Sequence, residues 1–239
     1  THKTGRLNLR RMHNLIRILA DLHNAGKEII LVSSGAIALG CGKLRLLERP
    51  KDTPTKQAAA AVGQCELMDM YDQQFANYGI TVAQILLTKT ILENERINNV
   101  KNCFQRLLDM NVIPIFNEND TVAIDELELE IGENDSLSAI VASLVNADLL
   151  VILSDIDGLY SEDPRRCEHA KLIPVVEHID AHIESIAGGA GTALGTGGMA
   201  TKINAAGIDM VILNGSRPEL LYDLFDGKPV GTRFLAKTN

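Results

Sequence analysis

Polar side chains follow four apolar segments of this 239-residue sequence, each at the point where the segment ends. The four endings are Ser33-Ser34-Gly35, Asn117–Asp120, Ser154-Asp155 and Asn214-Gly215-Ser216. In open α/β sheets, ligands bind beyond the carboxyl ends of parallel strands. Turn chemistry explains any single ending, and a helix N-cap is the alternative role for Ser34. Taken together, the endings predict a ligand site along one edge of a sheet.

A glycine-rich segment, LGTGGMATKINAA over 194–206, has the composition of a phosphate-binding loop. Glycine lets backbone N–H groups approach phosphate oxygens, a helix N-terminus favours negative charge, and Lys202 supplies a cation. The segment fits the dinucleotide fingerprint only weakly, because no apolar strand precedes it and no acidic partner follows. The Gly-Lys-Ser/Thr ending of a P-loop is absent. The alternative interpretation is a solvent-exposed glycine-rich loop.

The tripeptide Glu-Asn-Asp occurs twice, at 118–120 and at 133–135. Between the copies, residues 126–131 alternate Glu with apolar side chains, which predicts a half-exposed strand. Pairing with 121–124 would make this strand part of a hairpin, and we expect the hairpin to act as a flap over a ligand. Asn134 or Asp135 is a suitable N-cap for the helix that follows. We therefore expect both tripeptides to face one ligand.

The elements that position these residues follow from hydrophobic periodicity. Continuous Val- and Ile-rich runs predict buried parallel strands over 28–34, 112–120, 149–155 and 208–215, with a fifth over 80–87. Helical spacing predicts helices over 9–22, 55–77, 93–110 and 137–145, and Gly26 is the stop signal of the first. Alternating strands and helices predict an α/β fold with a three-layer open, mainly parallel sheet and helices on both faces. We expect one domain over 1–239.

Composition restricts the partners and the compartment. The formal net charge is -8 and there is no basic run, which argues against nucleic acid or an anionic membrane as the main partner. No apolar run reaches the length of a membrane span, and the first residues lack the apolar core of a signal peptide. Four widely spaced cysteines predict a cytoplasmic protein without disulfides, and no metal-ligand cluster is expected.

Five motifs together resemble the glutamate 5-kinases of the amino-acid kinase family. They are VSSGAIALG (32–40), NEND (117–120), IGENDSLSA (131–139), SDIDGLY-x-x-DPR (154–165) and GTGGMATK (195–202). The motifs occur in the family's order and cover almost the whole chain. The resemblance implies ATP-dependent phosphorylation of the glutamate γ-carboxylate, which gives L-glutamyl 5-phosphate for proline synthesis.

The resemblance also assigns roles to residues. Ser34, Asp120 and Asn134 would bind glutamate. Lys202 would neutralise charge on the transferring phosphoryl group, and Asp135 would orient the phosphate-binding lysines. The ATP-binding residues would be Ser154, Asp155, Thr196, Gly197, Gly198, Met199, Ala200, Thr201 and Lys202.

Elementary chemistry agrees with these roles. A carboxylate is already a nucleophile, so the reaction requires no general base. The protein must bring two anions together, which calls for positioning, cations and N–H donors. Asp120 suits the α-ammonium group of an amino acid, whereas Ser34 and backbone amides suit a carboxylate. We expect Mg²⁺ to be held mainly by the ATP phosphates.

The sequence departs from the family pattern in two places. The family begins with a strand and a Lys-x-Gly phosphate loop that we do not find; Lys3-Thr4-Gly5 has the spelling but follows no strand. Only four residues separate Lys202 from Gly207, which is short for a parallel crossover. We expect missing segments at both places. We also expect no RNA-binding-like domain after residue 234.

The family further implies proline as a feedback inhibitor, a homo-oligomer, and hand-over of the product to glutamyl-phosphate reductase. Three alternatives remain open at this point. One is another family member that phosphorylates acetylglutamate, aspartate or UMP, although NEND followed by IGEND disfavours it. A non-catalytic amino-acid-binding regulatory module is the second. A nicotinamide dehydrogenase, the third, needs a phosphate loop after the first strand, and none is visible.

Overall fold

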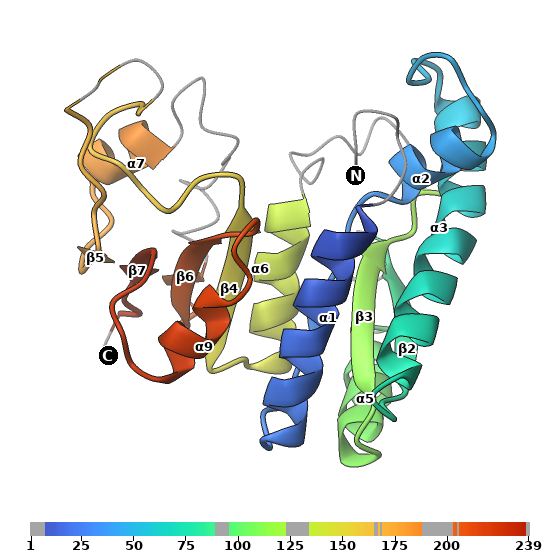
Figure 1. Cartoon of the computed structure of the whole chain (residues 1–239), viewed down its shortest axis with the longest axis horizontal. Helices are drawn as coiled ribbons and strands as arrows, with labels where there is room; N and C mark the ends of the chain where they lie inside the picture. Colours follow the sequence, from blue (N-terminus) through green and yellow to red (C-terminus); the bar gives the residue numbers. More distant parts are fainter. Residues whose placement is uncertain are drawn as a thin grey trace. The chain divides into compact units, whose positions relative to one another are not determined.

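The structure is a computed structural model that describes residues 8–88, 96–122, 134–164, 167, 169–187, 203–204 and 206–237. These residues form two compact units, 1–134 and 135–239 (Figure 1). Each unit has its own sheet, so the predicted strands are divided between a three-stranded and a four-stranded sheet. The α/β class is confirmed. The expectation of a single domain over 1–239 stays a prediction.

The first unit is built on three parallel strands with the order β1-β3-β2. Its elements are α1 (Leu9–Asn24), β1 (Leu31–Val32), α2 (Ala36–Lys43), α3 (Thr53–Ala76), β2 (Val82–Leu87), α5 (Ile97–Asp109) and β3 (Ile113–Glu118). The central strand β3 is buried from Ile113 to Asn117, which explains its continuous apolar run. β1 is shorter than the predicted 28–34 and pairs only with β3 among the described strands.

Local signals set the ends of the two long helices. The Asn8 side chain accepts a hydrogen bond from the Arg11 N–H at 3.1 Å and thereby caps α1. Asp52 caps α3 in the same way, accepting from the Thr55 N–H at 2.9 Å. After α1, Gly26 has φ +89°, a left-handed conformation that ends the helix as predicted.

The helices α2 and α3 pack with their backbones in contact. A Cβ atom added to Gly63 of α3 would lie 1.7 Å from the carbonyl oxygen of Ala36, and one added to Gly40 of α2 would lie 1.8 Å from that of Ala59. Only glycine at both positions permits this approach. We did not predict α2, because the two glycines within it, Gly40 and Gly42, weaken the helical pattern of the segment.

The second unit contains the sheet β4-β6-β7-β5. Its elements are α6 (Asn134–Val145), β4 (Leu149–Ser154), β5 (Val175–Val176), α7 (Ala181–Ala187), β6 (Asp209–Asn214), α9 (Leu220–Phe225) and β7 (Thr232–Phe234). β4 and β6 are parallel as predicted, whereas β7 runs antiparallel to β6. The sequence did not reveal β5 and β7, because strands of two or three residues are too short to show a period.

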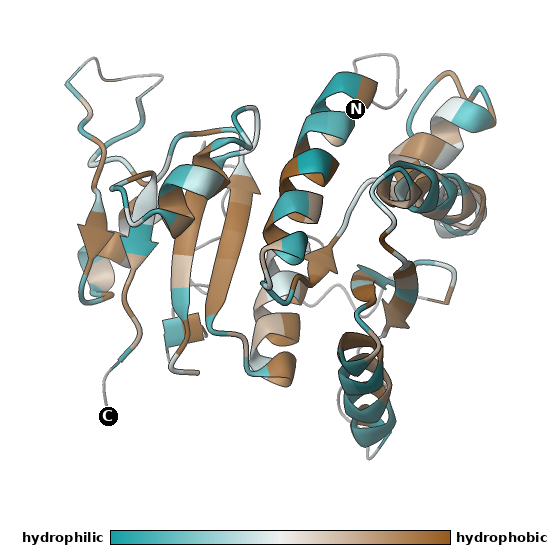
Figure 2. Ribbon diagram, turned by 60° about the horizontal axis from the view of Figure 1, so that its bottom comes forward, coloured by the Kyte–Doolittle hydropathy of each residue, from teal (hydrophilic) through white to brown (hydrophobic). Residues whose placement is uncertain are grey.

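The core of the second unit lies on these strands. Its buried members include Leu150 and Ile152 of β4, Met210 and Ile212 of β6, and Phe234 of β7. In Figure 2 the strands are predominantly brown, whereas the helices carry both brown and teal residues. This distribution is expected for sheets whose faces are covered by amphipathic helices.

Two further expectations concern the acidic hairpin and membrane-spanning helices. The predicted acidic hairpin between the two Glu-Asn-Asp tripeptides falls on 123–133, which lie outside the described residues. Of the helices that the structure describes, none combines the length and the apolar composition that a membrane span requires.

Candidate active-site residues

Ser34 and Asp120 follow neighbouring parallel strands of the first unit. β1 pairs with β3 through Leu31 opposite Ile115 and Val32 opposite Phe116, and the Ser33 N–H continues the ladder by donating to the Phe116 carbonyl at 2.9 Å. Because the carboxyl ends of parallel strands meet at one edge, the two predicted substrate residues lie on the same edge of this sheet.

Ser34 is exposed and lies directly before α2. The intervening Gly35 has φ +98°, and its carbonyl accepts the Leu39 N–H, the first hydrogen bond of the helix. The first N–H groups of a helix carry partial positive charge and favour an anion. The hydroxyl of Ser34 together with this turn therefore suits a carboxylate, and the contact of Ser34 with glutamate stays a prediction.

Asp120 and Glu118 form an acidic pair after β3. Burial raises the pKa of Asp120 above its usual range. The pKa of Glu118 is raised by burial and additionally by the negative charge of Asp120. Within the described part of the chain, no Lys, Arg or His forms an ion pair with Asp120. A half-buried carboxylate of this kind is stabilised by a ligand that carries an ammonium group.

A buried polar network lies beneath this edge. The Asn117 Nδ2 donates to Gln64 Oε1 at 2.9 Å, and its Oδ1 accepts the Glu118 N–H at 2.9 Å. Ser33 Oγ and Tyr71 OH are 2.9 Å apart. No sequence pattern predicted a role for Gln64 or Tyr71, and none predicted a specific contact for Asn117. The first position of the NEND motif was the only sequence feature that indicated a function for Asn117. Gln64 and Tyr71 lie within a long helix, where no motif distinguishes them from their neighbours.

Asn134 and Asp135 open α6, so the prediction that the second tripeptide begins a helix is confirmed for the backbone. Their side chains lie outside the description. The proposed contacts of Asn134 with glutamate and of Asp135 with lysines therefore stay predictions. The expected convergence of the two tripeptides also stays a prediction.

Ser154 and Asp155 end β4 in the second unit, opposite the end of β6. Ser154 pairs with Asn214, and its carbonyl accepts the Gly215 N–H at 2.7 Å. Ser154 is half-buried and Asp155 is exposed. Two predicted polar endings thus lie side by side on this sheet edge, where a hydroxyl and a carboxylate suit the hydroxyl and amino groups of a nucleotide.

Asp157 links these endings. It accepts a hydrogen bond from Asn214 Nδ2 at 2.9 Å and another from the Tyr160 hydroxyl at 3.3 Å. Burial raises the pKa of Tyr160, and the charge of Asp157 raises it further. Asn214 Oδ1 in turn accepts from the Ser216 N–H at 2.9 Å. The network fixes the loop after β4 against the loop after β6.

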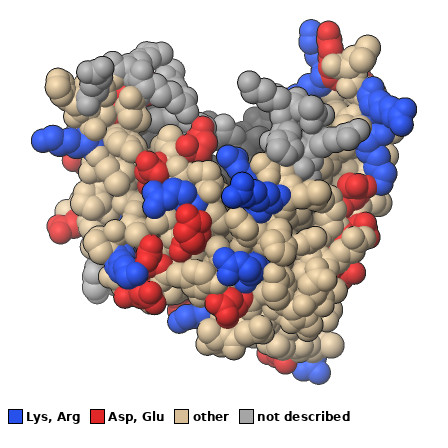
Figure 3. Space-filling view, in the orientation of Figure 1, with Lys and Arg blue, Asp and Glu red and all other residues tan. Residues whose placement is uncertain are grey.

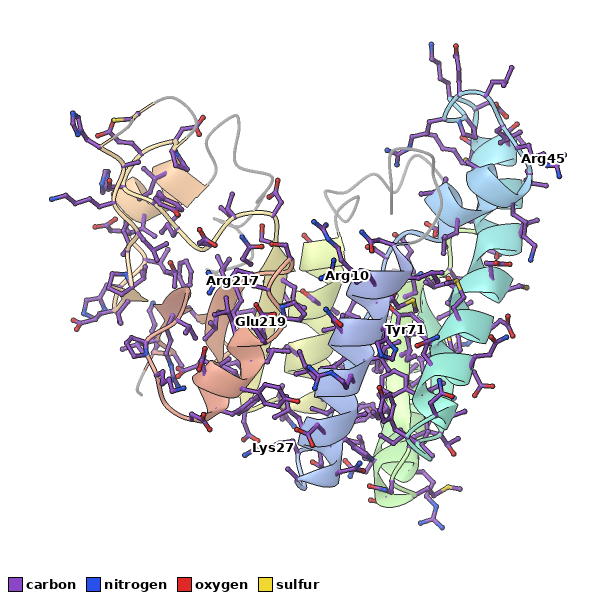
Figure 4. All side chains as sticks on the ribbon, viewed as in Figure 1. Arg10, Lys27, Arg45, Tyr71, Arg217 and Glu219 are labelled. Carbon is purple, nitrogen blue, oxygen red and sulfur yellow. The ribbon has the colours of Figure 1, made fainter. Side chains whose placement is uncertain are left out.

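After β6, Arg217 and Glu219 form an exposed ion pair of 3.8 Å (Figure 4).

The glycine-rich segment cannot be placed beside these groups. Thr196, Gly197, Gly198, Met199, Ala200, Thr201 and Lys202 all lie outside the described residues. The described residues that follow them are anchored: Ile203 is buried, and Asn204 Nδ2 donates to the Leu235 carbonyl at 2.6 Å. The phosphate-binding role of the segment stays a prediction.

Comparison with known proteins identifies the family. The model of the amino acid kinase family matches residues 3–210. The chain is 53% identical to the glutamate 5-kinase of Clostridium perfringens, over 99% of this chain and 91% of that protein. It is 56% identical to the glutamate 5-kinase of Clostridium tetani, over 99% and 90%.

Solved structures agree at the level of the fold. The crystal structure of the isopentenyl phosphate kinase substrate complex matches with a TM-score of 0.62 and 16% identity, over 96% of this chain and 92% of that one. The crystal structure of the T. acidophilum isopentenyl phosphate kinase product complex matches with a TM-score of 0.60 and 16% identity, over 94% of this chain and 91% of that one. At this identity the likeness concerns the fold alone. The family model covers most of the chain, and more than half of the residues are identical to those of two glutamate 5-kinases. The chain therefore belongs to the amino acid kinase family, in which it groups with the glutamate 5-kinases.

Proposed function

We infer that this chain is a glutamate 5-kinase, which transfers the γ-phosphoryl group of ATP to the γ-carboxylate of L-glutamate. The products are L-glutamyl 5-phosphate and ADP, and the reaction is the first step of proline biosynthesis. One observation carries the inference: more than half of the residues are identical to those of two glutamate 5-kinases over at least nine-tenths of both chains. The sheet edge of the first unit supports it, because its groups suit an amino acid.

The residues of the first unit would bind and orient glutamate. The Asp120 carboxylate, which is half-buried and has no cation among its described neighbours, would accept hydrogen bonds from the α-ammonium group. Ser34 and the N–H groups at the start of α2 would hold a carboxylate. Asn134 would add a side-chain amide. The γ-carboxylate needs no base, since it is ionised at neutral pH.

The transfer step is a displacement at phosphorus. An oxygen of the γ-carboxylate forms a bond to the γ-phosphorus of ATP while the bond from that phosphorus to the β,γ-bridging oxygen breaks, and ADP leaves with the electron pair. Negative charge accumulates on the phosphoryl oxygens, and Lys202 would neutralise it while Asp135 orients the lysine. Mg²⁺, coordinated mainly by the phosphates, would supply further charge neutralisation.

On the nucleotide side, Ser154, Asp155 and the segment from Thr196 to Lys202 would hold ATP. The described part of this set fits a nucleotide, because a half-buried hydroxyl and an exposed carboxylate lie at the end of β4 beside the ordered loop after β6. We further propose that the protein is cytoplasmic, that it forms a homo-oligomer, that proline inhibits it by feedback, and that glutamyl-phosphate reductase receives its product. The four free cysteines agree with a reducing compartment.

The direct test is glutamate-dependent release of ADP from MgATP by the purified chain. Hydroxylamine added to the same reaction converts an acyl phosphate to a hydroxamate, so formation of glutamyl hydroxamate identifies the product. Acetylglutamate, aspartate and UMP are the comparison acceptors. Activity with one of these and none with glutamate would refute the substrate, and activity with none of the four would favour a non-catalytic binding module.

A further inference from the structure

Helix α3 carries two buried polar side chains, and each is bonded to the end of a different strand. Gln64 Oε1 accepts from Asn117 Nδ2 at 2.9 Å, at the end of β3. Tyr71 OH lies 2.9 Å from Ser33 Oγ, directly after β1 (Figure 4). Gln64 and Tyr71 are seven residues apart, which is two helical turns and places them on the same face of α3. Helix α3 is thus hydrogen-bonded to the ends of both β1 and β3.

The bond at Gln64 has a defined orientation. The Glu118 backbone N–H can only donate, and it bonds to Oδ1 of Asn117 at 2.9 Å. Asn117 must therefore donate from Nδ2 to Gln64, and Gln64 must accept with Oε1. If the amide of Asn117 were rotated by 180°, its NH2 group would face the Glu118 N–H. If the amide of Gln64 were rotated, its NH2 group would face that of Asn117. Each rotation would place two donors against each other. This chain of bonds fixes the backbone at Glu118 relative to α3, two residues before Asp120.

The orientation leaves a donor unused. Gln64 Nε2 is buried, and none of the described residues provides it with a hydrogen-bond partner. An unpaired buried donor costs at least as much free energy as one neutral hydrogen bond returns. The one hydrogen bond of Gln64 to Asn117 therefore contributes little net stability to the fold. Its effect lies in what it positions.

The same helix also sets the position of Ser34. Next to Gln64, Gly63 lies against the Ala36 carbonyl so closely that an added Cβ would be 1.7 Å from that oxygen. Ala36 is two residues after Ser34. α3 therefore contacts the chain on both sides of Ser34, through Tyr71 at Ser33 and through Gly63 at Ala36, and it contacts the segment before Asp120 through Gln64.

We infer that Gln64 and Tyr71 are positioning residues of the glutamate site: through Asn117 and Ser33 they fix the two strand ends that carry Asp120 and Ser34. The inference rests on the proposed function for the identity of the ligand. Neither side chain needs to touch the substrate. Loosening the two bonds moves the groups that bind the amino acid and leaves the residues assigned to ATP unchanged.

The test compares Gln64→Met and Tyr71→Phe with the wild-type chain. Gln64→Met removes one unpaired donor and leaves another, Asn117 Nδ2, so the melting temperature changes little. We expect the glutamate KM to rise about tenfold for Gln64→Met and about threefold for Tyr71→Phe, with the KM for ATP unchanged within about twofold. Titration calorimetry gives the glutamate Kd independently of turnover.

Two variants provide matched controls. Gln73→Met changes an exposed glutamine of the same helix, and Tyr78→Phe removes a hydroxyl just beyond it. Both are expected to keep the wild-type constants. A double-mutant cycle with Asn117→Ala tests the route: if Gln64 acts through Asn117, Gln64→Met has little further effect in that background.

Three outcomes overturn the inference. The first is an unchanged glutamate KM and Kd in Gln64→Met and Tyr71→Phe. The second is a parallel loss of melting temperature, kcat and both KM values, which indicates a structural role. The third is full additivity with Asn117→Ala. Failure of the proposed function is seen separately, in the wild-type chain, and the variants are then compared on whichever acid the wild type phosphorylates or binds.

Discussion

At the scale of single residues, the acidic pair after β3 shows a conflict between stability and binding. Burial raises the pKa of Asp120 and of Glu118, and the charge of Asp120 adds to the effect on Glu118. An acid with a raised pKa holds its proton more tightly in the folded state than in the unfolded chain. The free energy of unfolding therefore falls as pH rises from the usual carboxyl pKa through the raised one, and at neutral pH the charges cost stability.

The first prediction follows for Asp120→Asn. The amide cannot ionise, so we expect the melting temperature at pH 7 to rise by roughly 2 °C, with the gain shrinking as pH falls from the raised pKa of Asp120 to the usual carboxyl pKa. The ammonium group loses its counter-charge, so the glutamate KM should rise at least about tenfold. Thermal unfolding across pH and steady-state kinetics measure the two effects. Asp72→Asn, at an exposed position of α3, is the control. An unchanged glutamate KM would remove Asp120 from the site.

A second prediction concerns Lys202, whose role rests on the motif alone. If it stabilises charge that develops during transfer, Lys202→Ala should lower kcat by about 10²–10³-fold while the glutamate KM changes far less. The comparison is Lys51→Ala, an exposed lysine before α3. A rise in KM with kcat unchanged would show that Lys202 binds the ground state and has no special role in the transition state.

At the scale of elements, backbone contact between α2 and α3 decides where the Ser34 turn lies. The glycines at the crossing leave no room for a side chain, and the atoms opposite them are carbonyl oxygens, which cannot turn away as a flexible side chain does. Packing of this closeness transmits strain, so an added methyl group must displace one helix.

The third prediction is made for Gly63→Ala. Alanine improves helix propensity by about 1 kcal/mol, but the overlap with the Ala36 carbonyl outweighs this gain. We expect a net loss of about 1–3 kcal/mol in the free energy of unfolding and a raised glutamate KM, because α2 begins beside Ser34. Cys65→Ala, an exposed change two residues away on α3, should stay within about 0.5 kcal/mol of wild type. Denaturant titration measures the free energy of unfolding of both variants. A Gly63→Ala variant more stable than wild type would contradict the close contact of Gly63 with the Ala36 carbonyl.

In the second unit, one hydroxyl of β7 makes two hydrogen bonds to backbone groups. Thr232 is fully buried, its Oγ1 donates to the Ile173 carbonyl at 2.6 Å, and the Leu159 N–H donates to it at 2.8 Å. The side chain thereby fixes the segment after β4 against β7.

The fourth prediction follows for Thr232→Val. The similar volume leaves two backbone groups unpaired, so the free energy of unfolding should fall by about 2–4 kcal/mol. Thr232→Ser keeps the hydroxyl and loses one methyl group, which should cost only about 1 kcal/mol. Denaturant titration of both variants measures the difference. Equal losses in the two variants would show that the methyl group, and not the hydroxyl, is what matters.

At the level of the whole molecule, 23 Lys and Arg residues stand against 31 Asp and Glu residues, which gives a net charge of -8. On the face seen in Figure 3, Lys and Arg side chains lie among Asp and Glu, and no large surface of one sign is visible there. One ion pair joins neighbouring strands: Arg233 of β7 lies 2.6 Å from Asp209 of β6. There, burial alone would raise the pKa of Asp209, but the Ala236 N–H and Arg233 outweigh it and lower that pKa.

The fifth prediction concerns ligand-linked stability. Glutamate at a hundred times its Kd should add about 2.7 kcal/mol to the free energy of unfolding, which raises the melting temperature by roughly 5–10 °C for a chain of this size. Aspartate, one methylene shorter, should shift it less, and Asp120→Asn should abolish the shift. Scanning calorimetry makes the measurement. A single transition would support the prediction of one domain, whereas two independent transitions, with only one moved by glutamate, would contradict it.

The sequence by itself determined the elements that have strong local causes. Continuous apolar runs located β2, β3, β4 and β6 to within two residues, because strands buried on both faces must be apolar throughout. Helical spacing and capping signals located α1, α3, α5 and α6. The polar strand ends and the order of five motifs pointed to the family and to Ser34, Asp120, Ser154 and Asp155, since ligands bind where such strands end.

Only the tertiary structure decided what lies between these elements. The strands β5 and β7 are too short to have a period. β7 pairs with the edge of β6 that β4 does not occupy, and β5 pairs in turn with β7. The division into two sheets and the burial that shifts the Asp120 pKa depend on tertiary contacts. The bonds from α3 to Ser33 and Asn117 join residues 38 and 53 positions apart in the chain. No local pattern encodes such contacts, because a glutamine or tyrosine within a helix looks the same in sequence whether it faces water or holds a strand.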